Sequence, residues 1–172
     1  MTKPGEVMSD YLHADAVLSD CGIYRYVLRR VWDGGPGSVT FVMLNPSTAD
    51  ATLDDPTIRR CVGFAKSWGY GELRVVNLFA LRATDPEKLR QAVDPVGPDN
   101  DRQILETVAG SEQVVLAWGA TIEKWKRSMR LRERPSIVKT MLEPYKPCCL
   151  GLTNGGHPKH PLYVPAKAGL QG

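Results

Sequence analysis

The 172-residue sequence predicts a three-layer α/β/α fold, in which helices cover both faces of a mainly parallel central sheet that follows an N-terminal antiparallel hairpin. The main observation is that short apolar runs typical of buried strands alternate with segments of helical periodicity. A second observation is that polar residues directly follow several of these strands. Because right-handed crossovers bring the ends of parallel strands to one edge, the sequence predicts a site there.

The composition, 42% hydrophobic and 24% charged, is typical of one globular domain spanning 1–172. The formal charge of +3 is too small to predict nucleic-acid binding by itself. Four cysteines without a Cys-x-x-Cys pair, and the absence of metal-binding or phosphate-loop motifs, predict no metal and no cofactor. Residues 1–10 lack an apolar signal-peptide core, and no run approaches the ~20 apolar residues of a membrane span. We therefore expect a cytoplasmic protein with no membrane partner.

The first part of the chain predicts a hairpin that leads into a buried strand. Residues 1–20 have few apolar positions, which predicts a loosely ordered segment. Residues 24–32 alternate partly at period two, and 33–37 are Gly- and Pro-rich turn residues. The apolar strand at 38–44 then follows, so an antiparallel pair of 24–32 with 38–44 is the simplest prediction.

A polar turn ends this strand and a helix begins soon after it. Asn45, Pro46 and Ser47 cannot continue the strand, because proline lacks a ladder donor and the other two favour turns. Asp55 followed by Pro56 is typical of a helix N-terminus. An apolar stripe at helical spacing predicts a helix over 56–68; it consists of Ile58, Val62, Ala65 and Trp68.

The same alternation continues toward the C-terminus. It predicts strands at 72–79, 113–118 and 147–152, and helices at 84–92, 98–109 and 121–130. Residues 165–172 read as a short tail.

The candidate catalytic residues lie after the predicted strands or in the late loop 153–162; they are Asn45, Asp50, Asp54, His157 and His160. An imidazole donates to a developing anion or exchanges a proton near neutral pH, although surface histidines are the plainer interpretation. Asp50, Asp54 and Asp55 are possible general bases, although helix capping already explains Asp55. Asn45 can also serve as an ordinary Asx turn.

The candidate substrate-binding residues surround the same edge; they are Pro46, Ser47, Arg59, Asn77, Phe79, Trp118, Gly119, Asn154 and Lys159. An unpaired buried amide is costly, so Asn77 either supports a neighbouring loop or contacts a ligand. Phe79 and Trp118 are core aromatics or stacking surfaces. Arg59 lies near the positive end of a helix dipole, which suggests a nearby anion. The basic run at 124–134 is either a solvated helix face or a phosphate contact.

Several motifs, taken in order, resemble a bacterial and phage family known as domain-of-unknown-function family 1643. They are Leu-Asn-Pro-Ser-Thr-Ala at 44–49, Asp-Asp-Pro-Thr-Ile-Arg-Arg-Cys at 54–61, Val-Asn-Leu-Phe-Ala-Leu-Arg-Ala-Thr-Asp-Pro at 76–86, Gly-Pro-Asp-Asn-Asp at 97–101, Ala-Trp-Gly at 117–119 and His-Pro-Leu-Tyr at 160–163. The resemblance covers about 20–164 and carries no established activity.

The order of strand ends also resembles, more distantly, the uracil-DNA glycosylase superfamily. The shared features are a strand ending in Asn-Pro, a second ending in Asn, a third ending in Trp-Gly and a late His-Pro loop. The resemblance implies that Asn45 positions a water, that Asn77 pairs with a base edge, and that His157 or His160 stabilises the leaving base. The late loop departs from the family pattern, because Lys159 and His160 are inserted and leave two candidate histidines.

These features lead to three alternative functions. The first is hydrolysis of the N-glycosidic bond of a modified or damaged base in nucleic acid or a nucleotide. The second is a non-catalytic module that binds a nucleotide or single-stranded nucleic acid in the same pocket. The third is hydrolysis of a small metabolite unrelated to nucleic acid.

Overall fold

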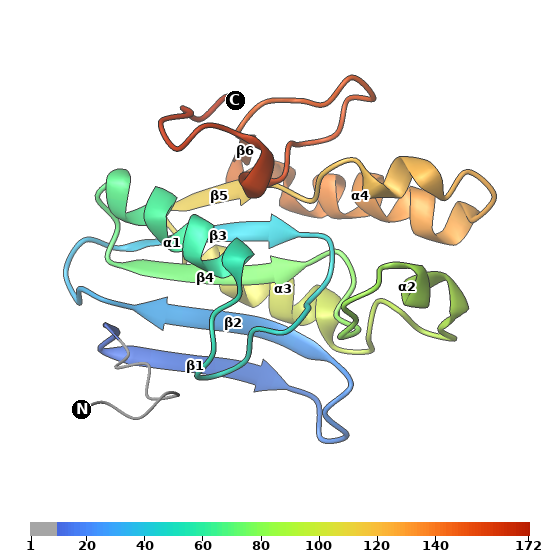
Figure 1. Cartoon of the computed structure of the whole chain (residues 1–172), viewed down its shortest axis with the longest axis horizontal. Helices are drawn as coiled ribbons and strands as arrows, with labels where there is room; N and C mark the ends of the chain where they lie inside the picture. The colour runs from blue at the N-terminus through green and yellow to red at the C-terminus, as the bar shows by residue number, and fades with distance from the viewer. Residues whose placement is uncertain (1–9) are drawn as a thin grey trace.

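A computed structural model describes residues 10–172, which form a mixed α/β fold around a six-stranded sheet (Figure 1). The strands are β1 (His13–Leu18), β2 (Arg25–Val31), β3 (Ser38–Met43), β4 (Glu72–Asn77), β5 (Gln113–Leu116) and β6 (Cys148–Cys149). Their order in the sheet is β1-β2-β4-β3-β5-β6. The last four strands in this order are parallel, whereas β1 and β2 are antiparallel to their neighbours.

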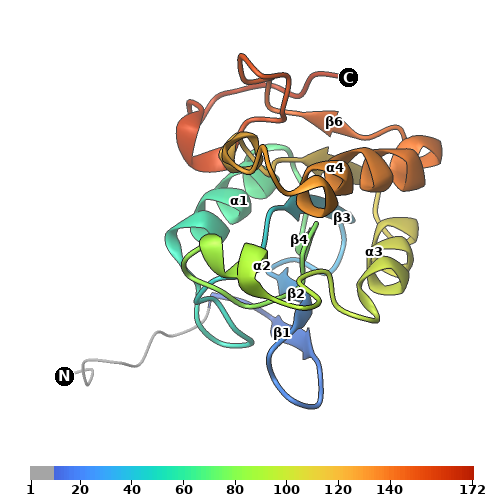
Figure 2. The ribbon, with the colours of Figure 1, turned by 90° about the vertical axis from the view of Figure 1, so that its right-hand side faces the viewer.

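Helices pack on both faces of the sheet (Figure 2). They are α1 (Pro56–Ser67), α2 (Glu87–Gln91), α3 (Asn100–Ala109) and α4 (Met129–Leu142), with 3-10 turns at Thr121–Lys124, Glu143–Tyr145 and Pro161–Tyr163. One apolar cluster joins α1 to the sheet, and another joins α3 and α4 to its opposite face. Along β3, Phe41 belongs to the first cluster and Val42 to the second, as the period of a strand requires. The alternation of strands and helices in the sequence thus correctly predicted the layers.

The sequence also located several elements closely. Asp55 caps α1 by accepting a hydrogen bond from the backbone N–H of Ile58 at 2.9 Å. The helix ends at Ser67, and Gly69 follows with a φ of +85°. The predictions of helices at 56–68, 84–92 and 98–109, and of strands at 72–79 and 113–118, are therefore confirmed, with small shifts at their ends.

The predicted pairing of 24–32 with 38–44 is wrong, because β4 lies between β2 and β3. The connection from β2 to β3 instead passes the start of β4 at Gly71, whose carbonyl accepts a hydrogen bond from the N–H of Trp32 at 3.0 Å. A Cβ on Gly71 would lie 2.1 Å from the carbonyl oxygen of Asp33, so only glycine allows this close approach. The turn residues at 33–37 predicted that the chain reverses, but not which strand would pair with β2.

The hairpin at the start of the sheet is formed by β1 and β2. Residues 13–18 thus form a strand inside the segment that was expected to be loosely ordered, and residues 1–9 lie outside the described part of the chain. Most of β1 is solvent-exposed at the edge of the sheet, so its sequence lacks the apolar alternation of a buried strand. At the other end, Gln171 and Cys149 exchange two backbone hydrogen bonds of 2.8 Å, so the expected tail extends the sheet edge.

The helix predicted at 121–130 is wrong in its position. A 3-10 turn occupies Thr121–Lys124, and α4 begins only at Met129 and continues through Pro135. Proline within a helix lacks an N–H donor and normally predicts its end, which concealed this element. Packing offsets the cost, because α4 buries Leu131, Val138 and Leu142 against the sheet. Within the described residues, none of the helices is long and apolar enough to cross a membrane.

Candidate functional site

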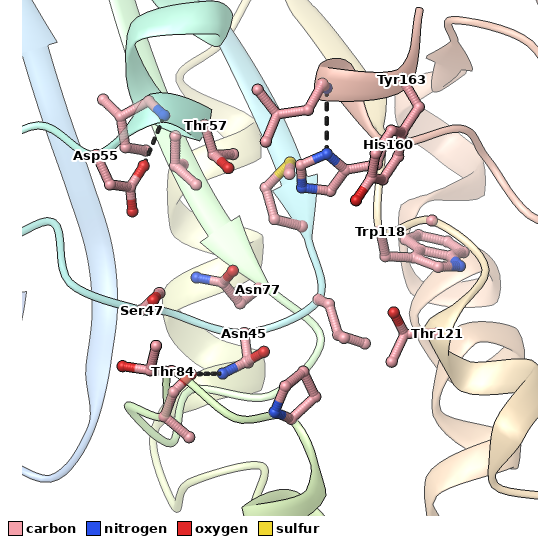
Figure 3. Close-up of a pocket in the computed structure, with 18 of the residues that line it drawn as sticks. Asn45, Ser47, Asp55, Thr57, Asn77, Thr84, Trp118, Thr121, His160 and Tyr163 are labelled. Carbon is pink, nitrogen blue, oxygen red and sulfur yellow. Dashed lines mark hydrogen bonds between the residues drawn. The ribbon is translucent and has the colours of Figure 1, made fainter.

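A pocket of about 260 Å³ lies at the carboxyl ends of β3, β4 and β5 (Figure 3). We call it the strand-end pocket. The N-terminus of α1, the loop after β4 and the late loop complete its walls. Its polar lining consists of Arg25, Asn45, Ser47, Asp55, Thr57, Asn77, Thr84, Thr121 and His160. Its volume is just below the range of about 300–1,000 Å³ of pockets for drug-sized ligands, so it suits a small molecule.

Asn77 lies at the floor of this pocket, and it is unusual because its buried amide makes no hydrogen bond with the part of the chain that the structure describes. It is the last residue of β4, and its side chain is only 1% exposed. Among the described residues, neither the Oδ1 nor the Nδ2 of its amide has a hydrogen-bond partner. Leaving each such group unpaired costs about 1–3 kcal/mol. The amide therefore keeps an unused acceptor and an unused donor, side by side, at a residue that lines the pocket.

Asn45 is held in one orientation by its own amide nitrogen. The Nδ2 donates to the carbonyl oxygens of Pro46 at 3.0 Å and Ala83 at 2.8 Å. Figure 3 shows this nitrogen turned toward the loop that carries Thr84, with the oxygen on the other side of the amide. Since both N–H groups have partners, the side chain can offer only an acceptor, Oδ1, to a bound molecule.

His160 also lines the pocket and has a defined tautomer. Its Nδ1 accepts a hydrogen bond from the backbone N–H of Leu162 at 3.1 Å, so the neutral ring carries its proton on Nε2. Burial lowers the pKa of His160 below its usual value, although the nearby Asp55 carboxylate partly opposes this. At neutral pH the side chain is therefore an uncharged donor through Nε2.

The other candidate histidine, His157, is placed outside the pocket. Its Nδ1 accepts a hydrogen bond from the Nε1 of Trp118 at 3.4 Å, and its Nε2 lies 4.0 Å from a carboxylate oxygen of Glu123. Trp118 and His160 line the pocket, whereas His157 does not and lies behind the Trp118 ring. Of the two histidines, the structure thus brings His160 together with Asn45 and Asn77.

The carboxylate in the pocket is Asp55, the general-base candidate that helix capping already explained. Its Oδ1 accepts from the N–H of Ile58, which leaves Oδ2 for other partners. Asp50 lies outside the lining and accepts from the N–H groups of Thr52 and Leu53, both at 2.8 Å, which lowers its pKa. Capping fixes the Asp55 side chain, and the same geometry places its carboxylate at the pocket wall.

Asp54 is committed to a different cluster. It accepts from the Nε of Arg30 at 2.8 Å and from the hydroxyl of Tyr11 at 2.5 Å. Arg30 is fully buried, and its guanidinium also holds the carbonyl oxygens of Asp50 and Leu53. Asp54 therefore anchors the loop 49–55 to the sheet rather than facing the pocket.

Arg25 is a pocket residue that sequence reasoning missed. It is 2% exposed, and its Nη1 donates to the carbonyl oxygen of Ala49 at 2.5 Å. Its Nε has no partner among the described residues. Burial lowers the pKa of Arg25 to about 10, partly opposed by Asp55, so the group stays positive at neutral pH. An arginine in a partly alternating strand gives no distinct sequence signal of this position.

The remaining predicted binding residues lie in three places: in the pocket lining, in the core and around the pocket. Ser47, Trp118 and Gly119 line the pocket. Phe79 instead lies in the core, edge-on to Trp125 with 6.3 Å between the ring centroids.

The other predicted binding residues lie around the pocket rather than in its wall. Pro46 is buried behind Asn45, and its carbonyl oxygen accepts from the N–H of Ala83 at 2.9 Å. Arg59 donates to the carbonyl oxygen of Asp54 at 3.0 Å. Asn154 and Lys159 line a separate, adjoining groove.

In the described part of the chain, no three His, Cys, Asp or Glu side chains are placed to hold a metal ion together. The lining residues of the pocket supply amides, hydroxyls, one carboxylate, one imidazole and one guanidinium.

Comparison with known proteins identifies a family, but not an activity. No curated protein and no solved structure gives a significant match to the chain. The sequence profile of DUF1643, described as a protein of unknown function, matches residues 25–162. This match confirms the resemblance that the ordered motifs indicated. The chain therefore belongs to the DUF1643 family.

Proposed function

We propose that the protein hydrolyses an N-glycosidic bond and that the strand-end pocket holds the base that is released. The observation that carries this proposal is the Asn77 amide, which is 1% exposed and has neither atom paired in the described residues. A protein retains such a costly group when a ligand completes it. The neighbouring donor and acceptor of an amide match the edge of a nucleobase, where an N–H or nitrogen lies beside a carbonyl or amino group.

The other pocket residues suit the two ends of the reaction. When the bond between sugar and base breaks, its electron pair remains on the base, and positive charge develops on the sugar. The Nε2–H of His160 supplies a donor to an oxygen of the departing base. Its neutral state suits this role, because Nδ1 already serves as an acceptor.

Attack by water completes the reaction. The Oδ1 of Asn45 orients the water by accepting one of its protons in a hydrogen bond, but an amide does not remove a proton at neutral pH. In this proposal Asp55 takes the other proton of the water through Oδ2, while the water oxygen bonds to the sugar carbon and the proton held by Asn45 stays on that oxygen. The released base then gains a proton from solvent.

The distant resemblance to uracil-DNA glycosylases supports this assignment without being its basis. In that resemblance Asn45 corresponds to a water-positioning residue, Asn77 to the base-pairing residue and His160 to the late-loop residue. The positions of the three side chains around one pocket agree with these roles.

Release of free base is the direct test. The wild-type protein is incubated with a panel of DNA, RNA and nucleotides carrying modified or damaged bases, and the products are separated by chromatography and mass. We expect release from at least one substrate, with loss of release in Asn45→Ala and Asn77→Ala. Gln91→Ala removes an exposed amide outside the pocket and should behave as wild type. Saturable binding without release would instead indicate a non-catalytic binding module.

A further inference from the structure

A second groove adjoins the strand-end pocket and shares part of its wall. Its volume is about 800 Å³. The two cavities have residues 119–121, His160 and Tyr163 in common, so a molecule seated in the pocket can continue into the groove. With a base in the smaller pocket, as proposed above, the groove leaves room for the neighbouring part of a longer ligand.

The groove is basic. Lys124, Lys126 and Lys159 line it, all three are exposed, and none forms an ion pair within the described residues. We call these residues the lysine triad. Free ammonium groups along a groove are suited to the phosphates of a polynucleotide.

The one carboxylate of the groove is occupied by the late loop. Glu123 accepts a hydrogen bond from the hydroxyl of Thr153 at 3.3 Å and lies 4.0 Å from His157. A Cβ on Gly155 would lie only 1.8 Å from its Oε1, so the loop packs closely against this carboxylate. Glu123 therefore holds the loop in place, and the lysine triad sets the charge of the groove.

An aromatic ring lies where the pocket and the groove meet. Tyr163 is 83% exposed, and its ring centroid is 5.5 Å from that of His160 (Figure 3). An exposed ring at the edge of a basic groove is a ready surface on which a base can stack. A base that is free of its complementary strand can stack on such a ring, whereas a base inside a duplex cannot.

We propose that the groove binds single-stranded nucleic acid. The phosphates follow the lysine triad, and the base next to the target stacks on Tyr163. Entry of one nucleotide into the strand-end pocket rests on the proposed function. Binding of the strand by the groove is independent of it. The substrate is therefore a polynucleotide rather than a free nucleoside.

The salt dependence of binding tests this assignment. Fluorescent single-stranded DNA and RNA oligonucleotides are titrated with the full-length protein at several salt concentrations. The triple variant Lys124→Gln, Lys126→Gln, Lys159→Gln should bind weakly and lower the slope of log affinity against log salt by about 2, at roughly 0.7 per phosphate contact. The control triple variant Lys88→Gln, Lys146→Gln, Lys167→Gln removes equal charge from exposed positions outside both cavities and should keep the wild-type slope.

Tyr163→Ala gives a separate test of stacking. Loss of one base stack should weaken binding about tenfold or more without changing the salt slope. The proposal would be overturned if the wild type and the lysine-triad triple variant gave equal slopes of log affinity against log salt. It would also be overturned if the protein bound a duplex as tightly as a single strand.

Failure of this inference can be distinguished from failure of the proposed function. Strand binding that needs the lysine triad, without release of any base, would refute only the glycosylase reaction. Equally fast release from nucleosides and oligonucleotides, in both the wild type and the groove variant, would refute only the groove.

Discussion

Replacing Asn77 by leucine should make the protein more stable and at the same time inactive. Leucine has nearly the same shape as asparagine but no polar atoms, so it removes the two buried groups that have no partner in the described residues. Each unpaired group costs about 1–3 kcal/mol, so Asn77→Leu, which removes both, should recover about 2–6 kcal/mol in all. The pocket then lacks its donor and acceptor, so base recognition is lost.

Thermal unfolding measures this change directly. For a domain of this size, 1 kcal/mol shifts Tm by about 2–4 °C, so an increase of about 4–24 °C is expected. Asn100→Leu is the matched control, since Asn100 is equally buried but its Nδ2 donates to the carbonyl oxygens of Asn77 at 3.0 Å and Leu78 at 3.2 Å. Asn100→Leu removes one atom, Oδ1, that is unpaired in the described residues, but it also removes the donor to the Asn77 carbonyl, while the Leu78 carbonyl keeps its hydrogen bond from the Nε of Arg134 at 2.7 Å. Its Tm should therefore lie below that of Asn77→Leu.

A lower Tm for Asn77→Leu would refute the reasoning. It would mean that the Asn77 amide has satisfied partners in the free protein and is not reserved for a ligand. Retained base release by this variant would separately exclude Asn77 from recognition.

Three further variants test the roles of the remaining polar groups. Asp55→Asn keeps an acceptor for the cap of α1 but removes the carboxylate, so kcat should fall by roughly 10²–10⁴-fold with little change in Tm. Asp54→Asn should instead lower stability, because it leaves the fully buried Arg30 without its counter-ion. The free energy of unfolding, measured by denaturant titration, should fall by about 3 kcal/mol. His160→Asn keeps an acceptor for Leu162 but lacks the Nε2 donor, and should lower kcat by about 10²-fold. Because burial lowers the pKa of His160, the unfolded chain takes up its proton first, so wild-type stability should fall as the pH drops below about 6.5. This part of the pH dependence should be absent from His160→Asn; an unchanged pH profile would contradict the assignment.

Local signals explain why some elements could be predicted from the sequence. The Asp55 cap and the apolar stripe of α1 lie within a few turns of each other and need no distant partner. The pairing of β2 with β4 depends on contacts between segments far apart in the chain, which the turn at 33–37 does not specify. Packing of α4 against the sheet likewise outweighs the local effect of Pro135.

The same reasoning applies to the candidate site. Asn45 and Asn77 end parallel strands, so topology alone predicted that they would lie at one edge. Arg25 reaches that edge differently, because β2 is antiparallel to β4 and therefore begins where β4 ends. Its place in the pocket could not be predicted without the strand order. The choice between His157 and His160 depended on which ring Trp118 shields, and this is a matter of packing.

Binding of nucleobases with a blocked edge tests the central claim most directly. Calorimetric titrations would compare each base with its derivative methylated on the ring nitrogen of the edge that pairs with an amide. If Asn77 reads this edge, at least one unmodified base binds, and methylation or Asn77→Leu weakens its binding at least tenfold. Equal binding of the methylated and unmodified bases, or unchanged binding by Asn77→Leu, would contradict the account.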